Sequence, residues 1–334
     1  MKNLVTGATG LVGMHILLDL LSKGEKVKAT FTKNSRLENV KKLFKFYNKE
    51  SLFSEIEWVE MDIEDVIQVF DTVKGVDHVY HSAAIVSFLK RDQSKMSNIN
   101  IKGTANIVNA CLENKVKKLG HVSSVAAIGR KGNGDYSEEN TWLESNDNSF
   151  YAISKNKAEN EIWRGVQEGL QSVIINPGII IGPSTWHRSS TALFKKINSG
   201  LSFYPTGLNG FVDVRDVSNS IIELMKSSFS SERYILVAEN LTYESVFKRI
   251  SKSLNVNPPT YVATPRLMNM VWKIEYLISL ITGKSPKITK ETAKTSSQKN
   301  FYNNEKIKKQ IGYEFNSIEN AIENTAKYIL EFKQ

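Results

Sequence analysis

Tyr151 and Lys155 are the two side chains of this sequence best suited to moving a proton. They stand four residues apart in the run Tyr-Ala-Ile-Ser-Lys, which we place at the start of a helix. Residues at this spacing project from one helix face, so a phenol and an ammonium can meet the same ligand. The unperturbed pKa of a tyrosine side chain is about 10, and an adjacent cation lowers it toward the pH at which acid catalysis is efficient. The pair therefore predicts a proton donor, Tyr151, assisted by Lys155.

A second chemical signature lies near the N-terminus, in the run Thr-Gly-Ala-Thr-Gly-Leu-Val-Gly that ends at Gly13. It follows a strand-like segment and opens a helix, which is the context that a dinucleotide site requires; an ordinary strand-to-helix turn is the alternative. The glycines permit a tight turn, close approach of a pyrophosphate and close helix packing, and the N–H groups at the helix start attract the anion. The predicted contacts are Gly7, Thr9, Gly10, Leu11, Val12 and Gly13.

The end of the second expected strand indicates which dinucleotide binds. An NAD site normally has Asp or Glu there, to bind the ribose 2′-hydroxyl. This chain instead has Phe-Thr-Lys-Asn-Ser-Arg at residues 31–36. Hydroxyl groups and two cations suit a 2′-phosphate, which a carboxylate would repel. We therefore expect NADP, held by Thr32, Lys33 and Arg36, with NAD as the alternative; in the other interpretation Lys33 and Arg36 are solvated loop charges.

Alternating strand and helix patterns must position these groups. Short β-branched runs alternate with helical patterns from residue 3 to about residue 176, which is typical of a parallel sheet with helices on both faces. The expected strands are 3–6, 27–32, 56–60, 78–81, 118–122 and 172–176, and the first helix is 14–22. The predicted fold class is α/β, a Rossmann-type doubly wound parallel sheet with a smaller, mostly helical substrate-binding lobe.

The second lobe begins where this alternation loosens. Gly182-Pro183-Ser184 opens a segment that we expect to leave the sheet. Strands at 211–214 and 234–237, with a helix at 218–227 between them, return to the core, and helices dominate from residue 243 onward. We expect residues 1–176 with about 211–240 to form the NAD(P)-binding Rossmann domain, and residues 177–210 and 241–334 to form the substrate-binding lobe.

Composition and charge exclude several classes of protein. With 41% hydrophobic and 24% charged residues, the chain has the balance of a folded soluble protein rather than a disordered one. The net charge of +9 comes without a nucleic-acid recognition motif, so no nucleic-acid partner is expected. The N-terminus has no signal-peptide pattern, which predicts a cytoplasmic location.

Residues 267–282 are the most apolar stretch in the later part of the chain. They contain Lys273 and Glu275, and the stretch is too short and too charged for a membrane span. We expect a buried or substrate-capping helix, with a membrane-surface helix as the alternative.

Metal and disulfide chemistry are not expected. The single Cys111 lies in an apolar helical pattern and is predicted to be a core residue. The histidines have no metal-ligand spacing, so each is expected to be structural: His15, His78, His81, His121 and His187.

The order of the motifs resembles that of the short-chain dehydrogenases/reductases, specifically their extended branch. Between the glycine loop and the Tyr-Lys pair lie Asp62-Ile63, His81-Ser82-Ala83-Ala84, Asn100-Ile101-Lys102-Gly103-Thr104 and Ser123-Ser124. Downstream, residues 175–183 resemble the strand end that contacts nicotinamide in this family. This segment is most similar to that of the dihydroflavonol-reductase-related group. Residues 139–142 and 211–217 also resemble segments of that group.

The resemblance implies a role for each matched residue. Ser124, Tyr151 and Lys155 would form the catalytic set: Ser124 donates a hydrogen bond to a carbonyl, Tyr151 protonates the alkoxide, and Lys155 also binds the nicotinamide ribose. Aligning Gly129 with the family glycine assigns the catalytic role to Ser124 and a cofactor contact to Ser123. The further cofactor contacts would be Asp62, Ile63, Ser82, Ala83, Ala84, Pro177, Gly178, Ile179 and Ile180. Family members commonly form homodimers through two helices per subunit, here 96–114 and 152–169.

The leading hypothesis is an NADP-dependent oxidoreductase that reduces a ketone or aldehyde, or oxidises the corresponding alcohol. A nucleotide-sugar epimerase or dehydratase that retains NAD is the alternative, but no acid ends the second strand and no acidic pair follows Ser124. A non-catalytic NADP-sensing module is a third candidate, although Tyr151 and Lys155 are both kept.

The substrate itself is not named by the sequence, because specificity lies in the second lobe. Aromatic residues in the expected pocket segment either stack on a planar substrate or pack in the core. They are Trp186, His187, Phe203 and Tyr204.

Overall fold

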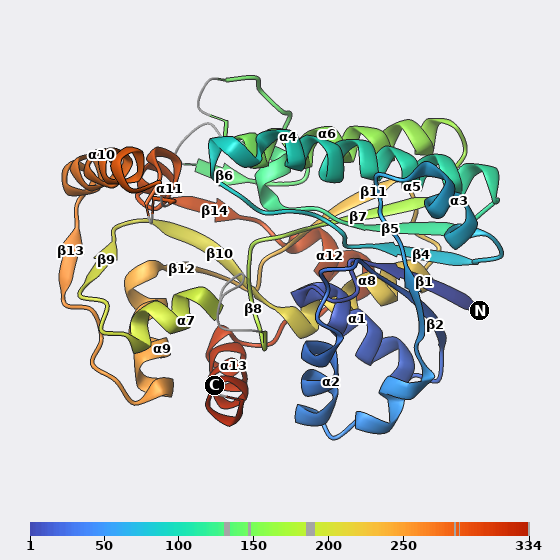
Figure 1. Ribbon diagram of the computed structural model, residues 1–334, viewed down its shortest axis with the longest axis horizontal. Helices are drawn as coiled ribbons and strands as arrows, with labels where there is room; N and C mark the ends of the chain where they lie inside the picture. Colours follow the sequence, from blue (N-terminus) through green and yellow to red (C-terminus); the bar gives the residue numbers. More distant parts are fainter. Residues whose placement is uncertain (130–133, 146–147, 185–190, 284, 287, 333–334) are drawn as a thin grey trace.

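A seven-stranded parallel sheet organises the chain (Figure 1). The computed structural model describes residues 1–129, 134–145, 148–184, 191–283, 285–286 and 288–332. Across the sheet, the strands are β3 (Glu57–Glu60), β2 (Lys26–Phe31), β1 (Lys2–Thr6), β4 (His78–His81), β5 (Lys118–Val122), β7 (Ser172–Pro177) and β11 (Glu232–Leu236). The six strands expected before residue 177 are all present, and the predicted Rossmann-type α/β fold class is confirmed.

Helices cover both faces of this sheet. Below it in Figure 1 lie α1 (Leu11–Ser22), α2 (Leu37–Phe46) and α8 (Val214–Lys226), and above it lie α3 (Val66–Val73), α5 (Gly103–Glu113) and α6 (Phe150–Gln167). Each layer buries its apolar side chains against the sheet in a core of its own. Because both faces are covered, β4, β5 and β7 are buried along their whole length. Cys111 is buried in the upper layer, as predicted.

The other helical segments are short or belong to the C-terminal part of the chain. They are η1 (Glu50–Glu55), η2 (Lys90–Asp92), α4 (Gln93–Met96), the π-helical η3 (Ser97–Lys102), η4 (Val125–Ile128), α7 (Thr191–Asn198), α9 (Tyr243–Leu254), α10 (Pro265–Thr282), α11 (Lys290–Thr295), α12 (Glu305–Ile311) and α13 (Ile318–Glu331). The helix expected at 96–114 corresponds to the continuous helical run of α4, η3 and α5, and the helix expected at 152–169 corresponds to α6. The helical run packs against α6.

A smaller sheet continues from the carboxyl edge of the main sheet. It consists of β8 (Ile179–Ile181), β10 (Leu208–Asp213) and β12 (Glu239–Thr242), with β10 in the centre. β7 leads into β8 through Gly178, where an added Cβ would lie 2.4 Å from the Gly210 carbonyl oxygen. This close backbone approach lets the chain bend out of the main sheet. The strand expected at 211–214 is therefore β10 of the smaller sheet, whereas the one expected at 234–237 is β11 of the main sheet.

Two further strand pairs add β structure to the lobe that was expected to be mostly helical. β9 (Phe203–Pro205) pairs with β13 (Tyr261–Ala263), and β6 (Gly134–Tyr136) pairs with β14 (Asn300–Tyr302). Each strand has only three residues, which is too short for a period-two pattern to be distinguished from a loop in the sequence.

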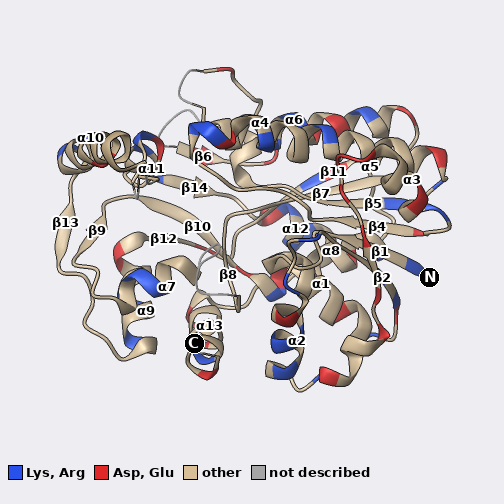
Figure 2. Cartoon of the chain, in the orientation of Figure 1, with Lys and Arg blue, Asp and Glu red and all other residues tan. Residues whose placement is uncertain are grey.

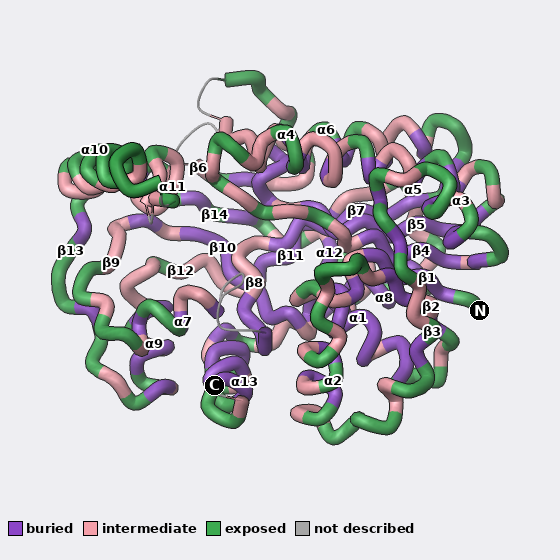
Figure 3. Tube along the Cα trace, viewed as in Figure 1, coloured by how far each residue is buried: buried purple, intermediate pink, exposed green. Residues whose placement is uncertain are grey.

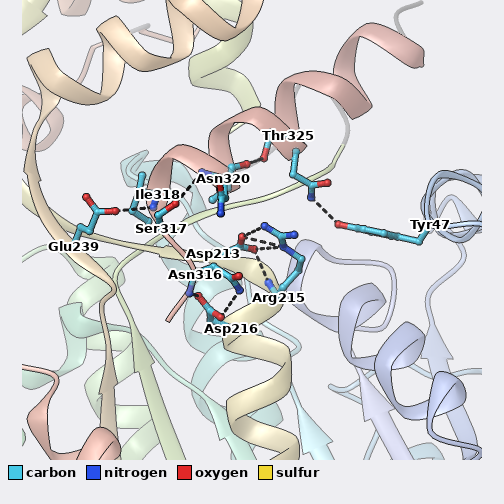
Figure 4. A network of polar contacts seen from close by, with 12 residues as sticks. Tyr47, Asp213, Arg215, Asp216, Glu239, Asn316, Ser317, Ile318, Asn320 and Thr325 are labelled. Atoms are coloured by element: carbon cyan, nitrogen blue, oxygen red, sulfur yellow. Dashed lines mark hydrogen bonds and ion pairs between the residues drawn. The ribbon is translucent and has the colours of Figure 1, made fainter. Parts of the chain in front are cut away.

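Polar contacts fix the segment before α13 to the start of α8 (Figure 4). Asp213 caps α8 by accepting the Arg215 backbone N–H at 2.8 Å, and it also pairs with the Arg215 guanidinium. The strand feeding a capped helix expected here is thus present. Asp216 accepts hydrogen bonds from the backbone and side-chain nitrogens of Asn316 at 3.0 and 2.7 Å. Burial, reinforced by Asp213, raises the pKa of Asp216 to about 6. The C-terminal helix is thereby held against the lower layer.

Helix α10 differs from its sequence-based expectation. None of its residues is buried, so the expectation of a buried helix is wrong, whereas a substrate-capping helix stays a prediction (Figure 3). The helix begins directly after β13 at one end of the molecule and packs against α11, and the main core lies elsewhere. No helix in the described ranges is long and apolar enough to cross a membrane.

Candidate active site

The strand order brings several predicted segments to one edge of the main sheet. The chain moves from β1 outward to β2 and β3, and then crosses back to β4 on the other side of β1. Thr6 pairs with His81, and Val122 pairs with Ile175, so β1, β4, β5 and β7 end at the same level. Ligands of open α/β sheets bind outside the carboxyl ends of the strands at such a switch point. The residues that follow these four strands therefore lie along this one edge of the sheet.

The glycine loop has the backbone shape that a diphosphate needs. Gly7 has a φ of +66°, and an added Cβ there would lie 2.6 Å from the backbone nitrogen of Ala83. A Cβ on Gly13 would lie 2.3 Å from the Gly7 carbonyl oxygen, so glycine is required for the close packing of loop and helix. Gly10 is the N-cap of α1 and provides no side-chain hydrogen bond, which leaves the first-turn N–H groups of Leu11 and Val12 for a ligand. These features fit a bound dinucleotide.

The segment after β2 lies beside the glycine loop. The Thr9 hydroxyl donates to the Ser35 Oγ at 3.3 Å, and Ser35 also accepts the Thr32 backbone N–H at 3.0 Å. Lys33 and Arg36 are exposed on this segment. Ser35 was not among the predicted contacts, yet it connects the phosphate loop to the two cations. A 2′-phosphate bound next to the glycine loop would lie near the charges of Lys33 and Arg36.

The remaining predicted cofactor contacts lie around the same edge. The Ser82 hydroxyl donates to the Thr6 carbonyl at 2.7 Å, which holds the Ser82-Ala83-Ala84 segment against the glycine loop. Pro177 is buried, while Gly178, Ile179 and Ile180 are partly exposed where β7 passes into β8. Asp62 and Ile63 follow β3, two strands away from β1; Asp62 is exposed, and Ile63 lies under Gly103.

The Lys155 ammonium group is buried at this edge of the sheet. It is 2% exposed, and its Nζ donates to the carbonyl of Val122, the last residue of β5, at 2.9 Å. Burial lowers the pKa of Lys155 to about 8, and the Glu159 carboxylate opposes this shift. Val122 uses one of the three ammonium N–H groups, and an ammonium can donate two further hydrogen bonds.

Ser123 and Ser124 differ in how far they are exposed. Ser123 is 5% exposed, whereas Ser124 is partly exposed and begins η4. The Ser124 Oγ accepts the Ala126 backbone N–H at 3.1 Å, so its own proton can be donated to a ligand. This difference favours Ser124 as the serine that meets a substrate.

Tyr151 lies in the first turn of α6. Ser149 caps this helix by accepting the Ala152 backbone N–H at 2.9 Å, which explains why the helix begins here. The Tyr151 ring is half-buried and meets the Phe88 ring edge to face, with 6.0 Å between centroids. Phe88 belongs to the segment that follows β4, so two elements orient the phenol.

Glu159 extends the Tyr-Lys face of α6 and was missed at the sequence level. It is 1% exposed, and its Oε1 accepts a hydrogen bond from the Asn176 Nδ2 at 2.5 Å. Its Oε2 lies 3.6 Å from the Arg233 guanidinium. Burial raises the pKa of Glu159, and its polar neighbours oppose that shift. Tyr151, Lys155 and Glu159 recur every four residues, and this spacing could have predicted the third member.

Asn100 was matched in the sequence but not assigned a role. It lies in the π-helical η3, and its side-chain amide accepts from and donates to the backbone of Ile85 at 2.8 and 2.9 Å. The same amide donates to the Ser154 Oγ at 3.0 Å, and Ser154 donates to the Tyr151 carbonyl at 2.8 Å. Asn100 thereby ties the segment after β4 to the first turn of α6. A π turn has no clear sequence signal, although it is common at functional sites.

Two buried histidines lie side by side on β4 and β5. The rings of His81 and His121 have centroids 5.1 Å apart, and His81 hydrogen-bonds the hydroxyls of Thr6 and Thr104 at 2.7 and 3.0 Å. Burial, with the Lys155 charge, lowers the pKa of His81 to about 3, and the pKa of His121 is also well below its usual range. Neutral imidazoles add no positive charge near Lys155, which agrees with the structural role expected for them.

Some predicted features lie elsewhere or beyond the described residues. Trp186 and His187 lie outside the residues that the structure describes. Phe203 is 47% exposed and packs on Tyr261, with ring centroids 5.5 Å apart. Within the described ranges, no three His, Cys, Asp or Glu side chains are grouped as metal ligands.

Comparison with known proteins identifies the family. A sequence profile described as the NAD dependent epimerase/dehydratase family matches residues 3–236, which include the glycine loop and the Tyr-Lys pair. The chain belongs to this family. The resemblance to the extended short-chain dehydrogenases/reductases is therefore confirmed, and a nicotinamide dinucleotide is the family's cofactor.

Relatives match over nearly the whole chain. A protein of Synechocystis sp., whose name gives dihydroflavonol 4-reductase as a proposed function, is 29% identical over 331 residues. The match covers 95% of this chain and 91% of that protein. Cinnamoyl-CoA reductase 1 of Petunia hybrida is 25% identical over 343 residues, covering 98% and 91%. The crystal structure of gox2253 has a TM-score of 0.83 at 26% identity, covering 99% and 98%. The chain is thus homologous to reductases of the extended branch, second lobe included.

Replacing the buried Lys155 by an apolar side chain should stabilise the fold at neutral pH. The folded pKa of about 8 lies below the ordinary lysine pKa of 10.5, so the charged form is destabilising below pH 8, and this penalty fades as the pH rises toward 10.5. Lys155→Met should raise the free energy of unfolding at pH 7 by about 1–3 kcal/mol, after loss of the Val122 hydrogen bond. Urea unfolding at neutral and alkaline pH measures this difference.

The control for this measurement is Lys157→Met on the same helix, since Lys157 is exposed. The difference in free energy of unfolding between Lys157→Met and the parent should not show the pH dependence expected for Lys155→Met. A Lys155→Met protein less stable than the parent at pH 7 would contradict the account.

Proposed function

We propose that this chain is an NADP-dependent oxidoreductase that reduces a ketone or an aldehyde, or oxidises the corresponding alcohol. Ser124, Tyr151 and Lys155 act as its catalytic set. The observation that carries the proposal is the buried ammonium of Lys155, which reaches the carboxyl end of β5 one helical turn from Tyr151. Ser124 follows the same strand, two residues after Val122, which supports a catalytic set at the carboxyl end of β5.

The chain's own groups account for the proton side of the reaction. Tyr151 donates its phenolic proton to the oxygen of a carbonyl substrate as that oxygen gains charge. Ser124 donates a hydrogen bond to the same oxygen, since its hydroxyl accepts the Ala126 N–H through one lone pair and keeps its proton for donation. Lys155 stabilises the phenolate that remains on Tyr151, and the buried Glu159 favours the charged form of Lys155.

The cofactor would be held by residues of the glycine loop and of the segment after β2. The first turn of α1 would bind the diphosphate, and Thr32, Lys33 and Arg36 would bind the 2′-phosphate. When bound, NADPH supplies the hydride. Phe88 beside Tyr151 is 41% exposed and Val86 is 62% exposed, so the rim near the phenol suits an apolar or aromatic carbonyl compound.

The names of the relatives support this class of substrate. A dihydroflavonol and a cinnamoyl thioester both carry a carbonyl group near an aromatic ring, and both relatives match this chain beyond the cofactor domain. The family description also includes epimerases, which makes a nucleotide-sugar epimerase the second candidate. An epimerase would be purified with NAD bound and would interconvert UDP-sugars without net oxidation, which mass analysis and a turnover assay would detect.

Tyr151→Phe should abolish carbonyl reduction without loss of NADPH binding. Removal of the phenolic hydroxyl removes the proton donor, for which a loss in kcat of about 10²–10⁴-fold is expected. The ring contact with Phe88 is kept, so the site should not collapse. NADPH absorbance with a panel of ketones and aldehydes measures turnover, and NADPH fluorescence measures binding.

Tyr261→Phe is a matched control, because Tyr261 is 63% exposed on β13 and lies outside the proposed catalytic set. It should retain full activity. A parent protein that binds NADPH but reduces no carbonyl compound would instead favour the sensing module, and a fully active Tyr151→Phe would refute the proposed acid.

The double variant Lys33→Ala/Arg36→Ala should weaken NADPH binding and spare NADH binding. Two charge-assisted contacts to the 2′-phosphate are lost, which corresponds to an increase in the NADPH Kd of about 10–100-fold or more. Titration of both nucleotides by fluorescence gives the ratio. Lys45→Ala, an exposed lysine on α2, is the control. Equal losses for NADPH and NADH would show that these cations do not recognise the 2′-phosphate.

A further inference from the structure

Helix α10 exposes an unusual amount of apolar surface. Its eighteen residues include no buried side chain, and seven of its apolar residues are at least 48% exposed. They are Met270, Ile274, Tyr276, Leu277, Ile278, Leu280 and Ile281. Isolated exposed apolar residues are common on soluble proteins, but a contiguous stretch of this kind marks an interaction site.

The exposed side of the helix carries apolar residues. Met270, Ile274, Leu277 and Ile281 recur at helical spacing and are all exposed. The less exposed residues are also mostly apolar: Leu267, Met268, Val271, Trp272, Glu275 and Ser279. A surface helix of a soluble protein normally keeps its apolar side chains on the inner side and has polar side chains outward. The outward apolar side of α10 therefore calls for a partner.

The apolar surface continues into the strand that precedes the helix. β13 leads directly into α10, and its Tyr261 and Val262 are 63% and 43% exposed. Phe203 on the paired strand β9 is 47% exposed and stacks near Tyr261. Figure 3 shows this exposed surface at one end of the molecule, around α10 and β13. We call α10 and the β9–β13 pair the apolar end.

The sequence around the apolar end carries much of the positive charge of the chain. Residues 261–299 contain seven Lys or Arg and two Asp or Glu, a net charge of +5 out of +9 for the whole chain. Arg266 and Lys273 lie on α10 itself and are exposed, and Lys290 is exposed on α11 (Figure 2). A helix that combines an apolar face with adjacent cations has the features of an interfacial helix that binds anionic lipid.

We propose that the apolar end docks this protein on an anionic phospholipid surface, with α10 lying in the plane of the interface. The exposed apolar side chains of α10 enter the headgroup region, and Arg266 and Lys273 contact lipid phosphates. The helix is anchored on the membrane rather than spanning it, as its length and charge require.

Charge favours a lipid surface over a second copy of the chain. A two-fold interface through α10 would bring the same positive segment of each subunit together, which is repulsive. An anionic membrane attracts that segment instead. The Arg91 guanidinium donates to the Ser285 hydroxyl at 2.7 Å, so the chain just after α10 contacts the segment that contains Phe88. Docking would thus bring the lipid close to the rim near Tyr151.

Co-sedimentation with vesicles tests the proposal without any need for enzymatic activity. The full chain should bind vesicles of phosphatidylcholine mixed with phosphatidylglycerol, bind more weakly to phosphatidylcholine alone, and be released by high salt. Ile274→Glu/Ile281→Glu should lower the partition coefficient by more than about tenfold, since both side chains are exposed and the fold does not depend on them. Arg266→Glu/Lys273→Glu should weaken binding to the anionic vesicles by about fivefold or more per charge.

Matched controls come from the other end of the molecule. Ile67 on α3 is 75% exposed, and Ile67→Glu should bind vesicles like the parent. Lys45→Glu on α2 is the control for charge reversal. The proposal is overturned if the parent does not bind anionic vesicles, or if the α10 variants bind as the parent does. It is also overturned if sedimentation velocity shows a dimer that Ile274→Glu/Ile281→Glu dissociates, because the face would then join two copies.

Discussion

The constraint on which the site depends is a charged lysine that must remain ionised inside the protein. Lys155 is 2% exposed, and burial pulls its pKa down to about 8. The Lys155 ammonium donates to the Val122 carbonyl, and the buried carboxyl group of Glu159 opposes the lowering of its pKa. A lysine whose pKa lies this close to neutral pH is sensitive to charge brought near it, which suits the role proposed for it beside Tyr151.

The bend of the chain out of the main sheet determines where the smaller sheet lies. β7 ends at Pro177, and Gly178 allows the backbone to turn into the smaller sheet beside Gly210. The contacts of Asp213 and Asp216 then hold the C-terminal segments to the lower layer (Figure 4). The smaller sheet and the C-terminal segments are thus attached through backbone packing and buried polar contacts. Helix α10 lies outside this attachment, with its apolar side uncovered.

Local patterns were sufficient to predict the cofactor half of the protein. The strands alternate with helices at short range, and the glycine loop carries its own conformational requirement, as the φ of +66° at Gly7 shows. The Tyr-Lys spacing likewise needs only a helix to be meaningful. The smaller sheet could not be predicted in this way, because its strands are short and pair with segments far away in the sequence, as β10 does with β8 and β12.

Residue types and spacing thus predicted a dinucleotide loop, a phenol-ammonium pair and an α/β core, since each depends on neighbours within a turn or a strand. Tertiary structure alone decided that Glu159 meets Asn176 and Arg233, and that Asn100 joins the segment after β4 to α6. It also decided that α10 is exposed rather than buried. The physical reason is the same in each case: burial and long-range hydrogen bonding depend on which elements pack together, and an apolar helical pattern does not specify whether a partner covers it.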